Sequence, residues 1–447
     1  MRIGLVGSGG REHAIAKALC KYSSRDSLYV YGSHLNPGIQ KLAASSLIGD
    51  MRDVRAIEDF FTANQVELVV IGPEVPLMDG ASDALRLKGI RVVGPSKAQA
   101  RLEGDKVFMR DLLRRRVKKG SPRWKEVCDI AAARNFIDEV GQVAVKPVGL
   151  TGGKGVSVMG VHYHTMEAAL QKVQNALEED GVVLLEERLI GEEFSRIAFV
   201  CDGKLSAMPV AQDFKYAFDG DQGGMTGGMG AYSMADGSMP FLTKTDLQEA
   251  DAILQLTVDA IEEESAENYR GFLYGQFIAT AQGVRVIEFN VRLGDPEAIN
   301  LMTLFESDAP IFLGDLADGF LNINGATFSP KASVSKYLVP AAYPQIGDEH
   351  VLVDFDEDGI KREGFSLIFA SIVEKSHGLE TLGSRALAIV GVGDDPGSIS
   401  TKMEVLLDQM EPATMRHRKD IGDARIINTK IQKMESLRSG LDMETRR

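Results

Sequence analysis

The sequence predicts a multidomain protein of mixed α/β and α+β class, with a doubly wound parallel sheet first and a small β-rich domain last. Apolar strand-like runs alternate with helical stretches over residues 1–101, glycine-rich loops separate the strands of the central region, and strands dominate after residue 320. The chain has 447 residues. At about 100–200 residues per domain, this length indicates two to four domains.

The N-terminal region carries its apolar runs at residues 1–7, 27–32, 66–74 and 90–96, with helical segments between them. Strands buried on both faces read as continuous apolar runs, and helices that connect them cover both faces of a parallel sheet. We therefore expect residues 1–101 to form one doubly wound domain.

The central region is expected to hold two units. Residues 125–188 are expected to form a smaller α/β unit, which follows a basic helical segment. From 190 to about 310, strands enclose a glycine-rich stretch. Residues 326–436 are expected to form the C-terminal α+β domain, and the polar tail at 437–447 is expected to fray.

Composition excludes several classes of protein. The formal net charge of −14 argues against nucleic acid or an anionic membrane as the main partner. No apolar run approaches about 20 residues, the length that a transmembrane helix needs. The three cysteines, Cys20, Cys128 and Cys201, are far apart and form no CxxC pair, which is typical of thiols in a reducing compartment. We expect a cytoplasmic protein.

The motif GSGGREHA, which begins at Gly7, lies between the first strand and the first helix. Glycines allow the backbone to approach a ligand closely, and a helix N-terminus offers free N–H groups, so the motif favours phosphate binding. A dinucleotide-binding domain would look similar here. Against it, Glu12 takes the sixth position of the GxGxxG pattern, and the second strand ends at Tyr31-Gly32 without an acidic residue for a ribose.

A second glycine-rich motif, KPVGLTGGKGV, runs from Lys146 to Val156. It is not a P-loop, but it has the character of a nucleotide lid, in which mobile N–H groups cover phosphates and Lys146 supplies positive charge. A glycine-rich hairpin without a ligand is the alternative. After it, VVLLEERLIGEE ends a strand at Glu186 and Glu187; such a turn suits an adenine edge, with Glu193 for ribose hydroxyls, although alone it is only an acidic turn.

The run VIEFNVRLGDPE carries three polar side chains on an otherwise apolar strand. Residues two apart on a strand share a face, so Glu288 and Asn290 point the same way, and their oxygens suit Mg²⁺. Arg292 suits a phosphate or a carboxylate. Gln276 adds a third ligand if the hairpin brings it opposite. A polar surface strand is the alternative.

The stretch from Ala211 to Ser233 contains six glycines in a short polar loop, which indicates tight backbone and ligand contact.

Together these motifs resemble the ATP-grasp ligases and, within them, the phosphoribosylamine–glycine ligase family. The resemblance covers nearly the whole chain, and the order of the motifs makes it specific. They are GSGGREHA, NPG (36–38), GPEVPL (72–77), GPSKAQARLEGDK (94–106), the lysine hairpin, AQDFK, TGGMGAY (226–232), EFNVRLGDPE and MRHRKDIGD (415–423).

The resemblance implies an activity. ATP, glycine and 5-phosphoribosylamine would give ADP, phosphate and glycinamide ribonucleotide, a step of de novo purine biosynthesis, through a glycyl phosphate intermediate. It also implies Mg²⁺ or Mn²⁺, small-molecule partners only, and a monomer or weak homodimer. Segments 102–124 and 189–325 would then be the ATP-grasp catalytic domain, 125–188 its mobile lid, and 1–101 the phosphoribosylamine-binding domain.

The resemblance further assigns roles to individual residues. Those expected to be catalytic are Arg292, Lys146 and Asp213. Those expected to bind ATP are Lys106, Lys146, Lys154, Glu186, Glu187, Leu189 and Glu193. Those expected to bind the sugar phosphate or glycine are Gly7, Gly9, Gly10, Arg11, Glu12, Asn36, Glu74, Asp213, Thr226, Gly227, Gly228, Arg292, Gly294 and Asp295. Those expected to hold the metal are Gln276, Glu288 and Asn290.

The chain also departs from the family pattern. After Asp111 it has RRRVKKGSPRWKEV in place of a short glycine-proline turn, and Pro147, Val148 and Thr151 differ in the lysine hairpin. Two rival functions remain open: another carboxylate–amine ligase of the same superfamily, and an inactive relative that binds ATP or a sugar phosphate as a sensor.

Overall fold

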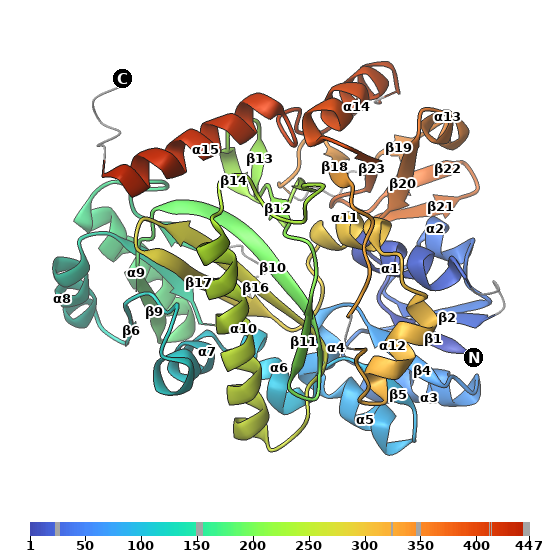
Figure 1. Ribbon diagram of the computed structural model, residues 1–447, viewed down its shortest axis with the longest axis horizontal. Helices are drawn as coiled ribbons and strands as arrows, with labels where there is room; N and C mark the ends of the chain where they lie inside the picture. The colour runs from blue at the N-terminus through green and yellow to red at the C-terminus, as the bar shows by residue number, and fades with distance from the viewer. Residues whose placement is uncertain are drawn as a thin grey trace.

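The computed structural model describes residues 1–22, 27–148, 155–322, 325–345, 350–410, 412 and 414–440. Figure 1 shows the N-terminal sheet at the right, a long-stranded sheet in the centre, a small α/β unit at the left and the C-terminal elements along the top. The mixed α/β and α+β fold class predicted from the sequence is confirmed. Within the described residues, no helix is long and apolar enough to cross a membrane.

The N-terminal sheet is wholly parallel, with strand order β3-β2-β1-β4-β5. Its strands are β1 (Ile3–Val6), β2 (Leu28–Gly32), β3 (Ser45–Ile48), β4 (Leu68–Ile71) and β5 (Arg91–Val93). The helices of this region are α1 (Gly10–Cys20), α2 (Pro37–Gln40), α3 (Val54–Ala63), α4 (Glu74–Asp79), α5 (Ala81–Leu87) and α6 (Lys97–Gly104). The sheet is doubly wound as predicted, but β3 was not predicted, because this edge strand is half exposed and lacks an apolar run.

The central sheet is antiparallel, with strand order β11-β10-β16-β17. Its strands are β10 (Gly191–Cys201), β11 (Lys204–Ala207), β16 (Arg270–Thr280) and β17 (Gly283–Asn290). The long helix α10 (Lys244–Ser265) packs against β16 and β17, and Figure 1 shows it crossing the sheet. Helices α11 (Glu297–Leu304) and α12 (Ala309–Ala317) follow β17 and lead back to the N-terminal sheet.

The small unit at the left of Figure 1 has an antiparallel sheet of order β6-β9-β7-β8. Its strands are β6 (Trp124–Val127), β7 (Val143–Pro147), β8 (Ser157–Val158) and β9 (Val183–Glu187), and its helices are α8 (Ile130–Val140) and α9 (Met166–Asp180). Its apolar core, which includes Phe136, Val145 and Leu185, is separate from the main core.

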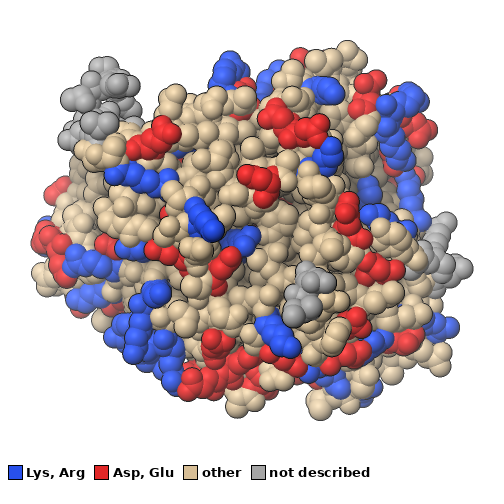
Figure 2. Space-filling view, in the orientation of Figure 1, with Lys and Arg blue, Asp and Glu red and all other residues tan. Residues whose placement is uncertain are grey.

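The basic segment that leads into this unit forms helix α7 (Lys106–Leu112) followed by a π-helical turn over Leu113–Val117. Its exposed arginines pair with acidic neighbours: Arg114 and Arg115 contact Asp111, and Arg116 contacts Glu263. Figure 2 shows Lys and Arg side chains gathered at the lower left beside a row of Asp and Glu side chains. The segment is therefore a solvated, charge-balanced surface.

The C-terminal sheet recruits strands from the central part of the chain, with path order β12-β15-β18-β23-β20 and β24 paired to β18. Its strands are β12 (Gln212–Asp213), β15 (Gly230–Ser233), β18 (Ala332–Pro340), β20 (Phe365–Phe369), β23 (Leu387–Gly393) and β24 (Met415–Arg416). A smaller sheet joins β19 (Leu352–Val353), β21 (Ile372–Lys375) and β22 (Gly378–Thr381), and the helices are α13 (Glu357–Arg362), α14 (Pro396–Met410) and α15 (Ala424–Ser439). The hairpin β13 (Tyr216–Phe218) and β14 (Gln222–Met225) projects between β12 and β15.

The main core includes an aromatic cluster where the central sheet meets α12. Phe199 is fully buried, and its ring centre lies 4.7 Å from that of Phe312, 5.4 Å from that of Phe272 and 5.8 Å from that of Phe305. Edge-on and tilted aromatic contacts of this kind are favourable beyond the apolar area that they bury. Phe199 therefore joins the sheet to the helices behind it.

We expect Phe199→Ala to lower the free energy of unfolding by about 3–5 kcal/mol, because the cavity left in the aromatic cluster cannot collapse fully. Urea denaturation, followed by circular dichroism, measures the change. Phe320→Ala is the matched control, since Phe320 is 59% exposed. Equal effects of the two substitutions would contradict the central place of Phe199 in the core.

Candidate functional site

The candidate site lies on one polar face of the central sheet. In the β16–β17 pairing, Gln276 lies opposite Glu288 and Tyr274 opposite Asn290. In the β10–β16 pairing, Ser195 lies opposite Gln276. Because directly opposite residues point to the same side of an antiparallel sheet, these side chains share one face. The hairpin register thus brings Gln276 to the position that its proposed role needs.

Glu288 and Asn290 are the oxygen ligands that the site offers to a cation. The Glu288 carboxylate makes no hydrogen bond or ion pair with the described residues, although its charge raises the pKa of Lys215 and of Arg292. The Asn290 side-chain oxygen accepts one hydrogen bond, from Arg292 Nη2 at 3.2 Å. A carboxylate without a partner beside an amide oxygen fits Mg²⁺, which keeps waters and takes phosphate oxygens.

Gln276 is less available than these two. It is fully buried, its amide oxygen lies within hydrogen-bonding distance of the hydroxyls of Ser195 and Tyr274, and its nitrogen donates to Glu193 Oε2 at 3.0 Å. Within the described part of the chain, no cluster of three or more His, Cys, Asp or Glu side chains could hold a metal ion. The geometry therefore fits an ion that depends on its substrate for ligands.

Two lysines approach the same edge from α7 and β7. Lys146 Nζ lies 2.7 Å from Glu186 Oε2 and donates to the Ile287 carbonyl at 3.2 Å. Burial lowers the pKa of Lys106, whereas the charge of Glu288 opposes that shift. Both cations lie beside β17, which we name the metal strand because its Glu288 and Asn290 are the expected metal ligands. There they can neutralise phosphate charge.

Glu186 forms ion pairs with two buried cations, Arg110 and Lys146. Arg110, fully buried, donates Nε to Glu186 Oε1 at 2.6 Å and Nη2 to Oε2 at 2.8 Å, and it also donates to the carbonyls of Val286 and Ile287. Burial raises the pKa of Glu186, but Arg110 and Lys146 outweigh this and hold the pKa below its ordinary value. Glu186 therefore anchors Lys146, and its contact with adenine stays a prediction.

The other expected ATP contacts lie along the turn between β9 and β10. Glu187 accepts a hydrogen bond from the Arg123 backbone N–H at 2.8 Å, and Leu189 is half-buried in the turn. Glu193 pairs with Lys215 at 3.1 Å, and although burial raises its pKa, Lys215 brings the net value below the ordinary one. Lys154 lies outside the described residues.

Arg292 is held between two carboxylates. Its Nη2 donates to Glu103 Oε1 at 2.7 Å, and its Nε lies 3.3 Å from Glu74 Oε2. Burial raises the pKa of Glu103 to about 7 against the opposing effect of Arg292, and Glu103 also accepts the Val291 N–H at 2.9 Å. Arg292 is thus fixed in place with its guanidinium at the end of the metal strand.

Asp213 lies in a strongly acidic corner. One oxygen of its carboxylate is buried without a hydrogen-bond partner. Burial raises the pKa of Asp213 to about 7; Lys215 lowers it, and Glu297 and Glu193 raise it further. Glu297 in turn accepts hydrogen bonds from Ser195 Oγ at 2.8 Å and Tyr274 Oη at 2.7 Å. A small cation would relieve this accumulation of carboxylates.

The N-terminal glycine loop faces the same region. Glu12 accepts the Gly9 N–H at 2.7 Å, and a Cβ added at Gly7 would lie only 2.6 Å from Glu12 Cγ. Arg11 donates Nε to Glu12 and Nη1 to the carbonyl of Leu293 at 3.1 Å. Arg11 thus ties the loop to the turn after the metal strand.

Gly10 and Asn36, which are also expected to contact the substrate, pack closely against other parts of the protein. A Cβ at Gly10 would lie 2.2 Å from Tyr337 Oη. The Asn36 amide nitrogen donates to the carbonyls of Ser8 and Phe369, both at 2.8 Å, and its oxygen caps the first turn of α2. Both ends of the Asn36 amide are therefore engaged by protein, and its expected contact with the sugar stays a prediction.

Arg385 joins the TGG loop, which is Thr226–Gly228, to the turn at Gly294–Asp295 that follows the metal strand. Arg385 Nη1 donates to the carbonyls of Gly227 at 2.7 Å, Gly228 at 3.0 Å and Asp295 at 2.9 Å, while Nη2 lies 3.1 Å from Asp295 Oδ2. Tyr337 Oη donates to the other Asp295 oxygen at 2.6 Å. Gly228 has φ +103°, and a Cβ there would lie 2.5 Å from Pro296. Close packing therefore fixes Thr226–Gly228 against Gly294–Asp295.

Sequence reasoning missed several residues of this site. Glu297 follows directly after GDP in a motif already singled out, and Lys215 lies inside AQDFK, so each could have been named from those motifs. Glu103 likewise lies inside GPSKAQARLEGDK, whereas Arg110, Tyr337 and Arg385 carry no such local signal, because their partners lie far away along the chain.

Models of known protein families match the first two thirds of the chain. Residues 1–103 match the phosphoribosylglycinamide synthetase N domain, and residues 104–298 match the ATP-grasp (A) domain of the same enzyme family. The chain belongs to the phosphoribosylglycinamide synthetase family. The resemblance found in the sequence motifs is thereby confirmed.

Relatives match over nearly their full length. Phosphoribosylamine–glycine ligase of Methanopyrus kandleri is 40% identical, with 98% of this chain and 99% of that protein covered. The Pyrococcus furiosus protein of the same name is 39% identical over the full length of both. Among solved structures, phosphoribosylamine–glycine ligase of Thermotoga maritima has a TM-score of 0.79 at 25% identity and covers 94% of this chain and 100% of its own.

The fold also extends to a different enzyme. The biotin carboxylase domain of the Hydrogenobacter thermophilus 2-oxoglutarate carboxylase has a TM-score of 0.68 at 15% identity, covering 98% of this chain and 95% of its own. At that identity the likeness shows the fold alone.

Asp213 allows a test by pH. Its raised pKa means that the folded protein favours the protonated acid, so this contribution to stability is complete below pH 3.8 and is lost as the pH rises through about 7. Asparagine carries no charge. We therefore expect the melting temperature of Asp213→Asn to rise relative to wild type between pH 5 and pH 8, at about constant ionic strength. A difference that stays constant with pH would contradict the raised pKa.

Proposed function

We propose that the protein ligates glycine to 5-phosphoribosylamine with ATP, giving glycinamide ribonucleotide, ADP and phosphate, through a glycyl phosphate intermediate in de novo purine biosynthesis. The observation that carries the proposal is the meeting of three features around the turn after Asn290: the end of β17 with Glu288 and Asn290, the Gly7–Gly10 loop tied by Arg11, and the Thr226–Gly228 loop tied by Arg385. The full-length relatives carry the name of this ligase. We expect the reaction to take place in the cytoplasm.

Glu288 and Asn290 would hold Mg²⁺ or Mn²⁺, which would neutralise the phosphates of ATP. Lys106 and Lys146 add positive charge beside them, and the contact of Lys146 with Glu186 keeps its ammonium at the edge of the sheet. The H. thermophilus domain of the same fold was solved with MgADP, which supports an ATP site in this architecture. Phosphoryl transfer between anions requires this neutralisation and alignment more than proton transfer.

Glycine would bind between Asp213 and Arg292. The unpartnered Asp213 oxygen and the nearby Glu297 charge form an acidic corner that suits an ammonium group. Arg292, fixed by Glu103 and Glu74, suits the glycine carboxylate and holds it toward the ATP phosphates. A larger amino acid would have to place its side chain against this packed corner.

The amine substrate would place its phosphate at the Gly7–Gly10 loop, where helix α1 begins. The backbone of Thr226–Gly228 and the Gly294–Asp295 turn would surround the sugar. Residues 125–188 would close over ATP, because an acyl phosphate must be kept from water until the amine attacks it.

We expect ADP release only when glycine, 5-phosphoribosylamine and ATP are all present, since each substrate completes a different part of the site. A coupled ADP assay with single omissions tests this requirement. Replacement of Mg²⁺ by Mn²⁺ should sustain activity, and chelation should abolish it. Turnover of another amino acid but not glycine would overturn the assignment and favour a different carboxylate–amine ligase, whereas ATP binding without any turnover would favour a sensor.

We expect Glu288→Ala to lower kcat by about 100-fold or more, because it removes the charged metal ligand. The same assay, run over a range of Mg²⁺ concentrations, measures the loss, and equilibrium binding of Mn²⁺ in the presence of ADP provides a second readout. Glu363→Ala, at an exposed position after α13, is the control. Normal metal dependence in Glu288→Ala would exclude it as a ligand.

A further inference from the structure

The segment from Met415 to Gly422 belongs to a motif that the proposed reaction leaves without a role. It grips the β13–β14 hairpin at several points. Arg416 Nη1 donates to the Ala217 carbonyl at 2.6 Å, the Lys419 N–H donates to Asp219 at 2.9 Å, and Asp420 accepts the Gly220 N–H at 2.9 Å. These contacts join parts of the chain about 200 residues apart.

Arg418 makes the largest set of these contacts with the hairpin. Its side chain is 1% exposed and makes a bidentate pair with Asp420, at 2.9 and 2.6 Å. Its Nη1 donates to the Tyr216 carbonyl and to Asp221 Oδ1, both at 3.0 Å, and the guanidinium lies 4.9 Å from the centre of the Phe214 ring. A buried guanidinium with all these partners fixes the hairpin much more firmly than a surface ion pair would.

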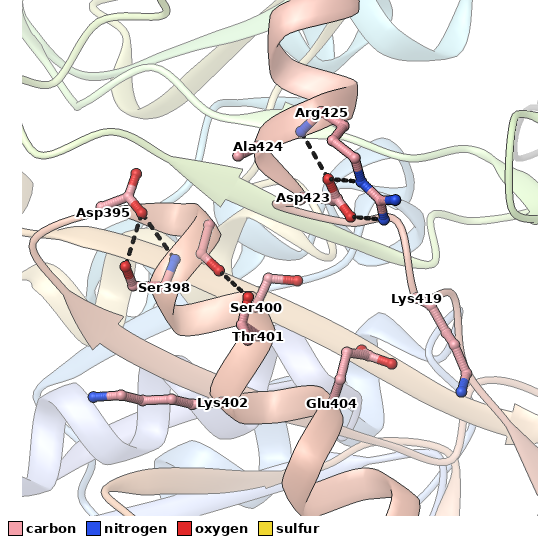
Figure 3. Close-up of a pocket in the computed structure, with 11 residues that line it drawn as sticks. Asp395, Ser398, Ser400, Thr401, Lys402, Glu404, Lys419, Asp423, Ala424 and Arg425 are labelled. Carbon is pink, nitrogen blue, oxygen red and sulfur yellow. Dashed lines mark hydrogen bonds and ion pairs between the residues drawn. The ribbon is translucent and has the colours of Figure 1, made fainter.

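The segment is itself held from the other side. The fully buried Lys336 of β18 donates to the Lys419 carbonyl at 2.9 Å, to Ser400 Oγ at 2.9 Å and to Glu404 Oε1 at 2.6 Å. Figure 3 shows Ser400 and Glu404 on α14, with Lys419 on the neighbouring segment. These three residues line a hollow of about 640 Å³. The segment thus connects the C-terminal sheet and α14 to the hairpin.

The base of the hairpin lies in the candidate site. Lys215 directly precedes β13 and Thr226 directly follows β14, and Thr226 donates both its N–H, at 2.7 Å, and its hydroxyl, at 2.8 Å, to the Lys215 carbonyl. Lys215 Nζ reaches Glu193 at 3.1 Å, and its charge acts on Asp213. A displacement of the hairpin would therefore move Lys215, the cation beside Asp213, together with Thr226 at the start of the TGG loop.

We propose that Arg418 is a positioning residue that sets Lys215 and the Thr226–Gly228 loop, so that the C-terminal segment determines how glycine and the amine substrate are held. The role in substrate binding rests on the proposed function. Arg418 lies behind the hairpin and acts through it, without contact with the substrates.

The test compares Arg418→Lys and Arg418→Ala with Arg425→Ala in the full chain. Lysine keeps the charge but cannot form the bidentate pair. Arg425 is an exposed arginine of the same region that pairs with Asp423 rather than with the hairpin. Hydrogen exchange of residues 212–230, measured by mass spectrometry, should be faster in Arg418→Ala, intermediate in Arg418→Lys and unchanged in Arg425→Ala.

Kinetics supply the second readout. The KM values for glycine and for phosphoribosylamine should each rise about tenfold in Arg418→Ala, as expected for a shift of about an ångström in binding groups, and less in Arg418→Lys. The KM for ATP should rise less than these two, because Lys106 and Lys146, which would bind its phosphates, lie on α7 and β7 and not on the hairpin, although Lys215 also pairs with Glu193. An equal rise in all three KM values would mean that Arg418 only stabilises the fold in general, and it would overturn the proposal.

Two further outcomes are distinct. Unchanged hydrogen exchange over residues 212–230 in Arg418→Lys and Arg418→Ala overturns the positioning role whatever the kinetics show. An inactive wild-type enzyme with glycine and phosphoribosylamine overturns the proposed function, while faster exchange confined to the hairpin would still support the positioning role of Arg418.

Discussion

The alternation of side chains along β10, β16 and β17 is the constraint on which the site depends. Near the site, Ser195, Tyr274, Gln276, Glu288 and Asn290 point into a polar face, whereas neighbours such as Phe194 and Phe277 pack into the apolar core. A shift of one residue in the β16–β17 register would turn Gln276 away from Glu288 and send the Glu288 carboxylate into the core. The ring centre of Phe277 lies 5.6 Å from that of Phe194. This aromatic packing holds the strand register and, with it, the position of the polar side chains of the site.

Charge in this site is balanced in pairs that leave few groups free. Glu186 is neutralised by Arg110 and Lys146, and Arg292 by Glu103 and Glu74. Such buried pairs are costly to form, and breaking one leaves an uncompensated charge. Among the described carboxylates of this site, that of Glu288 makes no hydrogen bond or ion pair, and one oxygen of Asp213 has no hydrogen-bond partner. These are where a metal ion and an ammonium group would bring positive charge.

The fold class and much of the site could be predicted from local sequence. Period-two alternation was enough to pair Glu288 with Asn290, and glycines marked each loop that later proved to be closely packed. Long-range partners were beyond this reasoning. The contacts of Asn36 with Ser8 and with Phe369, 333 residues away, are invisible in sequence. Arg385 stands outside every recognised motif, and β3 has no apolar run because half of it faces solvent.

The pairing of β15 with β18 has a consequence for biosynthesis of the chain. Gly230 pairs with Lys336 and Ser233 with Ser333, so a strand made early waits for about 100 further residues before its neighbour exists. During that interval β15 presents an open edge, and the nascent polypeptide is exposed to pairing with other chains. Translation must pass β18 before this edge is covered, and it must pass Arg418 before that side chain can hold the hairpin. A ribosome that stalls between β18 and Arg418 would therefore leave a polypeptide whose hairpin lacks the contacts of Arg418.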